Sequence, residues 1–223
     1  MSMFKTTRRW LAPALLIAAA GCRPHDSNTA SVSSRDWANP VLRVAFLGAG
    51  NDSRIPFARE ALAHWNSEFA RLGVKARFDS GTVRGDSVPD NILASASVAV
   101  PYGGLRDNTV LERITDIPAD VVIALSQGDF VSFSIPWKKG SKGVVGLRRA
   151  DIPPLTLPNT VRNVVAHELG HVLGLSHNAD STTLMCGRPA SCRPSSFVSD
   201  SARFFPLTAK DEATIRAVWR SDR

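Results

Sequence analysis

Three of the chain's five histidines lie within eleven residues, in the segment HELGHVLGLSH at 167–177. His167 and His171 are four residues apart, so on a helix both side chains project from one face, where two ring nitrogens can hold one metal ion. Glu168 follows the first histidine directly. This His-Glu-x-x-His spacing is typical of two zinc ligands with a general base beside them.

A third histidine, His177, can reach the same ion if the chain turns back after the helix. Gly174 stands three residues after His171, and glycine readily takes the left-handed conformation that ends a helix and reverses the chain. Three nitrogen ligands with an open fourth position are typical of catalytic rather than structural zinc. Zinc would polarise a carbonyl and acidify a water, and Glu168 would carry the proton to the leaving nitrogen.

The complete motif resembles that of the metzincin metallopeptidases. It runs from His167 through His171 and Gly174 to His177 and is followed eight residues later by Met185. The sequence of the motif is most similar to that of the matrix-metalloproteinase-like members, or matrixins. The resemblance implies that Met185 lies on a tight turn, the Met-turn, as an apolar floor beneath the zinc rather than as a ligand.

The same resemblance implies an α+β fold. The expected domain has a twisted, mixed, mainly parallel sheet of about five strands, two long helices, a zinc cleft, and a small C-terminal subdomain with the Met-turn and a final helix. Two residues depart from the matrix-metalloproteinase pattern: Asn178 replaces a common serine, and Cys186 replaces the usual tyrosine after Met185. Because this segment borders the family's main specificity pocket, the cleavage preference does not transfer.

The elements that would position the motif follow from hydrophobic periodicity. An amphipathic pattern predicts a helix over 57–72 that ends at Gly73, and Thr160 is expected to N-cap a zinc helix over 161–173. A capping box at Thr208 and Asp211 begins the last helix. Strands are expected over 41–47, 74–80, 119–126, 130–137 and 143–149. Residues 81–118 are left as a long loop or a weak strand around 92–100, and 138–142 as a solvated hairpin loop.

The N-terminal segment has the pattern of an export signal. Residues 1–21 begin with basic side chains, continue with an apolar run about half as long as a membrane-spanning helix needs, and finish on small residues. The segment AAGC at 19–22 resembles a bacterial lipobox, which implies a lipid anchor on Cys22 and a place in the bacterial cell envelope. Ordinary cleavage after the small residues, giving a periplasmic or secreted protein, is the alternative.

Composition and charge indicate where the folded domain begins and which partners to expect. Residues 22–40 are rich in Ser, Asn, Asp and Pro and are expected to be a flexible tether to a metallopeptidase domain over 41–223. Cys186 and Cys192 are expected to form a disulfide, since an exported chain meets an oxidising compartment. The net charge is +7, but no Lys/Arg stripe is interleaved with aromatic residues, so a nucleic-acid partner is not expected. His25 and His64 are expected to face solvent.

We therefore expect a tethered zinc endopeptidase that acts on peptides or proteins. An unprimed substrate strand would pair with a sheet edge drawn from 131–149. Two alternatives stay open: a zinc hydrolase acting on non-peptide or cell-wall amides, and a non-catalytic tethered binding protein that keeps zinc for stability. Calcium is not indicated, because no Asp-x-Asp-x-Asp-Gly loop is present. The oligomeric state is left open.

Overall fold

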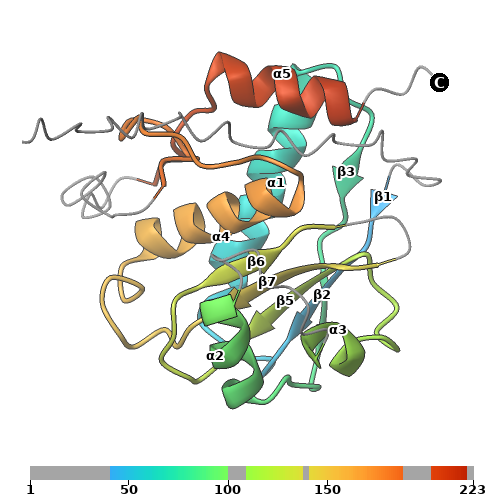
Figure 1. Ribbon diagram of the computed structural model, residues 1–223, viewed down its shortest axis with the longest axis vertical. Helices are drawn as coiled ribbons and strands as arrows, with labels where there is room; N and C mark the ends of the chain where they lie inside the picture. The colour runs from blue at the N-terminus through green and yellow to red at the C-terminus, as the bar shows by residue number, and fades with distance from the viewer. Residues whose placement is uncertain (1–40, 100–108, 138–140, 188–201, 220–223) are drawn as a thin grey trace, which may run out of the picture. The chain divides into compact units, whose positions relative to one another are not determined.

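The structure is a computed structural model that describes residues 41–99, 109–137, 141–187 and 202–219. Its centre is a five-stranded sheet with the strand order β4-β2-β5-β7-β6 (Figure 1). The strands are β2 (Val44–Leu47), β4 (Thr82–Arg84), β5 (Val121–Leu125), β6 (Phe133–Ile135) and β7 (Gly143–Leu147). All neighbours are parallel except β6, which runs antiparallel to β7. The predicted mixed, mainly parallel sheet is confirmed.

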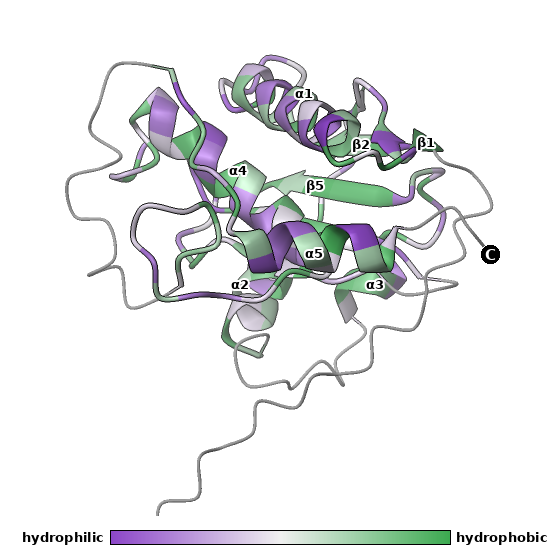
Figure 2. Cartoon of the chain, turned by 90° about the horizontal axis from the view of Figure 1, so that it is seen from above, coloured by the Kyte–Doolittle hydropathy of each residue, from purple (hydrophilic) through white to green (hydrophobic). Residues whose placement is uncertain are grey.

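Both faces of the sheet are covered, which explains why its central strands are continuous apolar runs. Every residue of β5 is buried, and successive side chains point to opposite faces. Val121 and Ile123 belong to one apolar cluster, whereas Val122 and Ala124 belong to a second cluster on the other side. Figure 2 shows this apolar strand lying among the helices.

Two long helices pack against each other on the first face, α1 (Ile55–Arg71) and α4 (Pro158–Val172). The indole nitrogen of Trp65 on α1 donates a 2.9 Å hydrogen bond to the carbonyl of Ala166 on α4. As predicted, α1 is followed by Gly73 in the left-handed conformation, with φ of 70°. The contact with Trp65 fixes the position of α4 one residue before His167.

The second face is covered by α2 (Asp90–Ala99) and α3 (Thr109–Arg113). The prediction of a loop or strand around 92–100 was therefore wrong. Leu93 and Ser97 are four residues apart and are both buried, so they lie on one narrow face of the helix that packs against the sheet. That face contains too few apolar residues to give a helical period in the sequence alone.

The remaining elements complete the frame of the α4 region. Two residues of the predicted strand 74–80 form β3 (Arg77–Phe78), which pairs in parallel with β1 (Val41–Leu42). The last helix, α5 (Ala209–Val218), begins with the predicted capping box between Thr208 and Asp211. None of the helices in the described ranges has the length and apolar character needed to cross a membrane.

Three local predictions need correction. The zinc helix begins at Pro158 after an extended Leu157, so Thr160 lies in its first turn and does not cap it; proline at the first position suits a helix start. Residues 138–140 of the loop expected over 138–142 lie outside the described residues, but Lys142 is half-buried, and its ammonium group donates to the carbonyls of Ile117 and Ala119 at 2.6 and 2.9 Å. His64 does not simply face solvent, since its ring stacks on Phe204 with centroids 4.1 Å apart.

Candidate metal centre

The three predicted histidines converge on one point. The Nε2 atoms of His167 and His171 are 3.2 Å apart, and they lie 3.1 and 2.9 Å from Nε2 of His177. Nitrogens bound at about 2.0–2.1 Å around a tetrahedral zinc ion are separated by about 3.3 Å. The observed triangle is close to that size, so the three histidines are positioned to bind one zinc ion.

Backbone carbonyls orient the two rings on α4. Nδ1 of His167 lies 2.7 Å from the carbonyl oxygen of Leu184, and Nδ1 of His171 lies 2.8 Å from that of Leu175. A carbonyl only accepts a hydrogen bond, so each Nδ1 carries a proton and Nε2 is the nitrogen that is left to bind a cation. The Nε2 atoms of His167 and His171 are 3.2 Å apart, and a cation between them would relieve the repulsion of their lone pairs.

Burial keeps His171 in the neutral form that a metal requires. Burial of the ring is the main cause that lowers the pKa of His171 to about 4. The carbonyl of Leu175 partly opposes this shift, and the neighbouring His177 adds to it. At neutral pH His171 is therefore unprotonated at Nε2 and ready to bind a cation.

The turn after α4 returns His177 to the site from outside the helix. Gly174 has φ of 101°, in the region that favours glycine, and its N–H bonds the carbonyl of His171 at 3.0 Å. The N–H of Leu175 closes the turn on the carbonyl of Gly170 at 2.9 Å. This geometry confirms the chain reversal predicted at Gly174.

Met185 is fully buried against the metal-binding turn of α4. A Cβ built on Gly170, which lies between the two helical histidines, would stand 2.5 Å from the sulfur of Met185 and 3.3 Å from the ring of Trp65. Met185 therefore packs directly on the backbone of α4, in the position of an apolar floor. The absence of a side chain at Gly170 allows this approach.

The segment around Met185 is paired with the segment that carries His177. The N–H of Asn178 bonds the carbonyl of Met185 at 2.9 Å, and the N–H of Gly187 bonds the carbonyl of Asn178 at 2.9 Å. A Cβ built on Gly187 would stand 2.7 Å from Cβ of His177. Gly187 thus lets the third histidine lie flat against the chain that leaves the Met-turn.

Glu168 lies on α4 directly after the first histidine and is 8% exposed. Cys186 is buried beside Met185. Cys192 and Cys22 lie outside the described residues, as do residues 1–40, so the disulfide, the lipid anchor, the signal and the tether stay predictions.

Sequence reasoning missed the groups that hold the ligands in place. The carbonyls of Leu175 and Leu184 are backbone acceptors, which leave no trace in residue type. Gly187 is one of 15 glycines, and only its approach to His177 distinguishes it. Gly170 carried the clearest signal, since it is a helix-breaking residue inside an otherwise regular helix.

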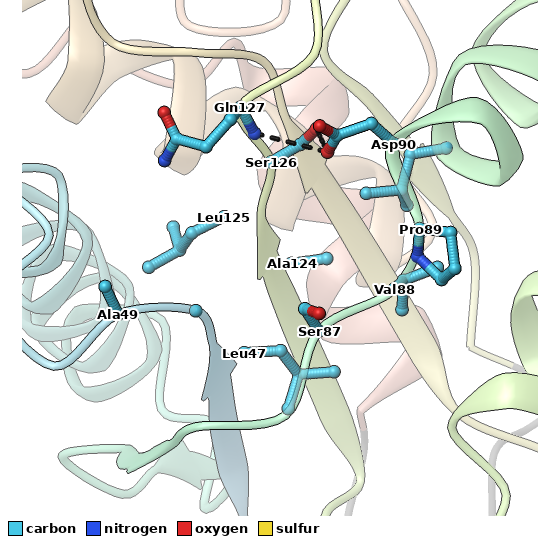
Figure 3. Close-up of a pocket in the computed structure, with 12 residues that line it drawn as sticks. Leu47, Ala49, Ser87, Val88, Pro89, Asp90, Ala124, Leu125, Ser126 and Gln127 are labelled. Atoms are coloured by element: carbon cyan, nitrogen blue, oxygen red, sulfur yellow. Dashed lines mark hydrogen bonds between the residues drawn. The ribbon is translucent and has the colours of Figure 1, made fainter.

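A separate pocket of about 330 Å³ lies at the carboxyl ends of β2 and β5 (Figure 3). Its lining combines Leu47, Leu93 and Leu125 with polar groups at one side, where the hydroxyl of Ser126 donates to the carboxylate of Asp90. None of the three histidines lines it. The pocket is therefore distinct from the metal centre.

A known protein family matches most of the chain. The family model described as matrixin matches residues 45–219. Among solved structures, the chain is similar to the crystal structure of archaemetzincin from Methanopyrus kandleri, with 17% identity and a TM-score of 0.46; the match covers 80% of this chain and 96% of that one. No curated protein matches the chain significantly. The match over residues 45–219 places the whole helix-and-turn motif inside one family model, and the chain belongs to the matrixin family of zinc metallopeptidases.

Proposed function

We propose that the chain is a zinc-dependent endopeptidase in which Glu168 is the general base. The observation that carries the proposal is the convergence of three Nε2 atoms within 3.2 Å of one another, with a carboxylate on the residue after the first ligand. A structural zinc site closes with four protein ligands, whereas this cluster contains three among the described residues. The open position is where a substrate carbonyl and a water can meet.

The roles of the residues follow from this arrangement. When bound, zinc supplies a Lewis acid that polarises the substrate carbonyl and lowers the pKa of water. His167, His171 and His177 would hold the ion, and because imidazole ligands add no negative charge, they would leave its positive charge undiminished. Glu168 accepts a proton from the attacking water and delivers it to the nitrogen of the cleaved bond.

We propose that β6 receives the substrate. It is one of the two edge strands of the five-stranded sheet, and it lies beside the metal-binding helix, which packs against both β6 and β7. An extended peptide can add to such an edge through backbone hydrogen bonds, which fix its scissile bond without demanding a particular side chain. The edge lies within the 131–149 segment expected from the sequence.

The test combines zinc content with peptide cleavage. Glu168→Gln removes the base but none of the ligands, so the variant should retain one zinc per chain by elemental analysis and cleave a peptide library about 10²–10⁴-fold more slowly. Glu112→Gln, at an exposed position on α3, is the matched control and should leave both readouts unchanged. Cleavage by Glu168→Gln at the wild-type rate would exclude the proposed mechanism.

The same purified protein should be tested on non-peptide and cell-wall amides. Hydrolysis of these substrates but not of any peptide would replace the endopeptidase assignment with the amide-hydrolase alternative. Full zinc loading without hydrolysis of either class would instead support the non-catalytic binding protein.

We also propose export to the bacterial cell envelope with a lipid on Cys22. The support is the sequence pattern of residues 1–22. Labelling cells with a radioactive fatty acid should mark the wild-type chain and leave Cys22→Ala unlabelled. Release of an unlabelled wild-type chain into the periplasm or medium would favour ordinary signal cleavage.

A further inference from the structure

Asn163 lies one helical turn before His167 and is fully buried. Its amide nitrogen donates to the carbonyl of Arg203 at 2.9 Å, and its amide oxygen accepts from the N–H of Phe205 at 3.1 Å. The second amide proton goes to the carbonyl of Asn159 on the preceding turn, also at 2.9 Å. The side chain therefore fastens residues 203–205, the segment that leads into α5, to the metal-binding helix.

The next residue of that segment holds the Met-turn. The carbonyl of Pro206 accepts the N–H of Leu184 at 2.8 Å. The carbonyl of Leu184 is the group that orients His167, at 2.7 Å from Nδ1. The hydrogen bonds thus form a closed ring: it leaves α4 at Asn163, passes through residues 203–206 and the Met-turn, and returns to α4 one turn later at His167.

We propose that Asn163 is a positioning residue for the zinc centre, acting on the His167 imidazole through residues 203–206 and Leu184. Asn159, one turn earlier on α4, adds a second link to this segment, because its side-chain oxygen accepts from the N–H of Arg203 at 3.2 Å. Without the Asn163 amide, the carbonyl of Arg203 and the N–H of Phe205 lose a buried partner. The segment then relaxes, the Leu184 carbonyl moves with it, and His167 loses the orientation that aims Nε2 at the metal.

This proposal rests on the zinc-binding histidines and not on the peptidase reaction. Its readout is metal affinity, so its failure and the failure of the proposed function are distinguishable. A chain that binds zinc normally after loss of Asn163 would overturn the positioning role while leaving hydrolysis untouched. A chain without peptidase activity would leave the positioning role intact.

Asn66 on α1 provides a matched control. Its amide bridges a backbone in the same way, donating to the carbonyl of Phe78 at 2.9 Å and accepting from the N–H of Phe78 at 2.7 Å. This bridge joins α1 to β3 and belongs to no chain of hydrogen bonds that reaches a histidine among the described residues. Asn66→Ala and Asn163→Ala remove the same chemical group from a helix, so they separate general destabilisation from an effect on the metal.

The experiment measures zinc affinity by competition with a chromophoric chelator, using the full chain. Asn163→Ala should bind zinc about tenfold more weakly than wild type, as expected when the partner of a ligand is disturbed. Asn66→Ala should keep the wild-type affinity even though it unfolds at lower urea concentration. The visible spectrum of the cobalt-substituted protein should change in Asn163→Ala alone, because it reports ligand geometry.

A second variant guards against failure to fold. Asn163→Asp keeps the oxygen that accepts from Phe205 but loses the donor to Arg203, so it removes half of the bridge at constant volume. We expect its zinc affinity and cobalt spectrum to be disturbed in the same direction. Wild-type affinity and spectrum in a folded Asn163→Asp or Asn163→Ala variant, or an equal loss in Asn66→Ala, would overturn the proposal.

Discussion

The sulfur of Met185 lies where a side chain of Gly170 would begin: a Cβ built on Gly170 would be 2.5 Å from it. Because Gly170 stands between His167 and His171 on α4, the two helical ligands are held from below by this contact. The fully buried methionine and the glycine are therefore complementary, and a side chain at position 170 would require either Met185 or the helix that carries the metal site to move.

We expect Gly170→Ala to destabilise the protein by about 1–3 kcal/mol, the usual cost of forcing a methyl group into a packed core. The free energy of unfolding in urea measures this change. Gly85→Ala, where a Cβ meets no atom within 4 Å, is the control and should change little. Met185→Ala combined with Gly170→Ala should recover part of the loss, and strict additivity of the two changes would contradict direct contact.

Gly187→Ala should act on the third ligand more than on stability. A Cβ at Gly187 would stand 2.7 Å from Cβ and 2.8 Å from Cγ of His177, and His177 is the exposed member of the triad, so its ring can be pushed aside. We expect about tenfold weaker zinc binding with a small change in urea unfolding. Zinc titration of the apo protein in competition with a chelator provides the measurement. Unchanged affinity would show that the ring adapts without cost.

Removal of zinc should lower the melting temperature. Ligand binding to the folded state alone adds about 4 kcal/mol when the free zinc concentration is 1,000 times the dissociation constant. Differential scanning calorimetry before and after treatment with a chelator should show this loss, and added zinc should reverse it. His171→Ala should remove the dependence on zinc, because the cluster then keeps only His167 and His177. A zinc-dependent shift that persists in this variant would place the ion elsewhere.

His64 should make the apo protein less stable in mild acid. Burial against Phe204 is the main cause that lowers the pKa of His64, with Glu68 opposing the shift and Arg71 adding to it. Well above pH 6.5, the ordinary pKa of histidine, the residue is neutral in both the folded and the unfolded state and contributes no pH dependence. As the pH falls below that value, the unfolded chain takes up a proton that the folded chain still refuses, so stability is lost.

The measurement compares wild type with His64→Phe, which keeps an aromatic ring against Phe204 but cannot titrate. The difference in free energy of unfolding between pH 7.5 and 5.5, measured with a chelator present, should be smaller in the variant. Titration of the metal-binding histidines is common to both proteins and cancels in the comparison. An equal pH dependence in the two proteins would exclude a contribution from His64.

The metal ligands were predictable because their arrangement is local. Histidines four residues apart share a helix face whatever the helix packs against, and Gly174 turns the chain by its own conformational freedom. The apolar runs of β5 and β7 were equally clear, because strands covered on both faces need no polar residues. These features depend on neighbours in sequence, so the sequence alone identifies them.

The supports of the site depend on residues far apart in the chain. Asn163 meets Arg203 across 40 residues, and His167 meets the carbonyl of Leu184 across 17. The helix at 90–99 forms because the sheet offers a surface for Leu93, and His64 is half-buried because Phe204 stacks on its ring. No distinctive sequence pattern marks a supporting backbone carbonyl, a glycine that allows a close approach, or a helix that is half polar. Their roles arise only when folding brings the two partners together and excludes water from the contact.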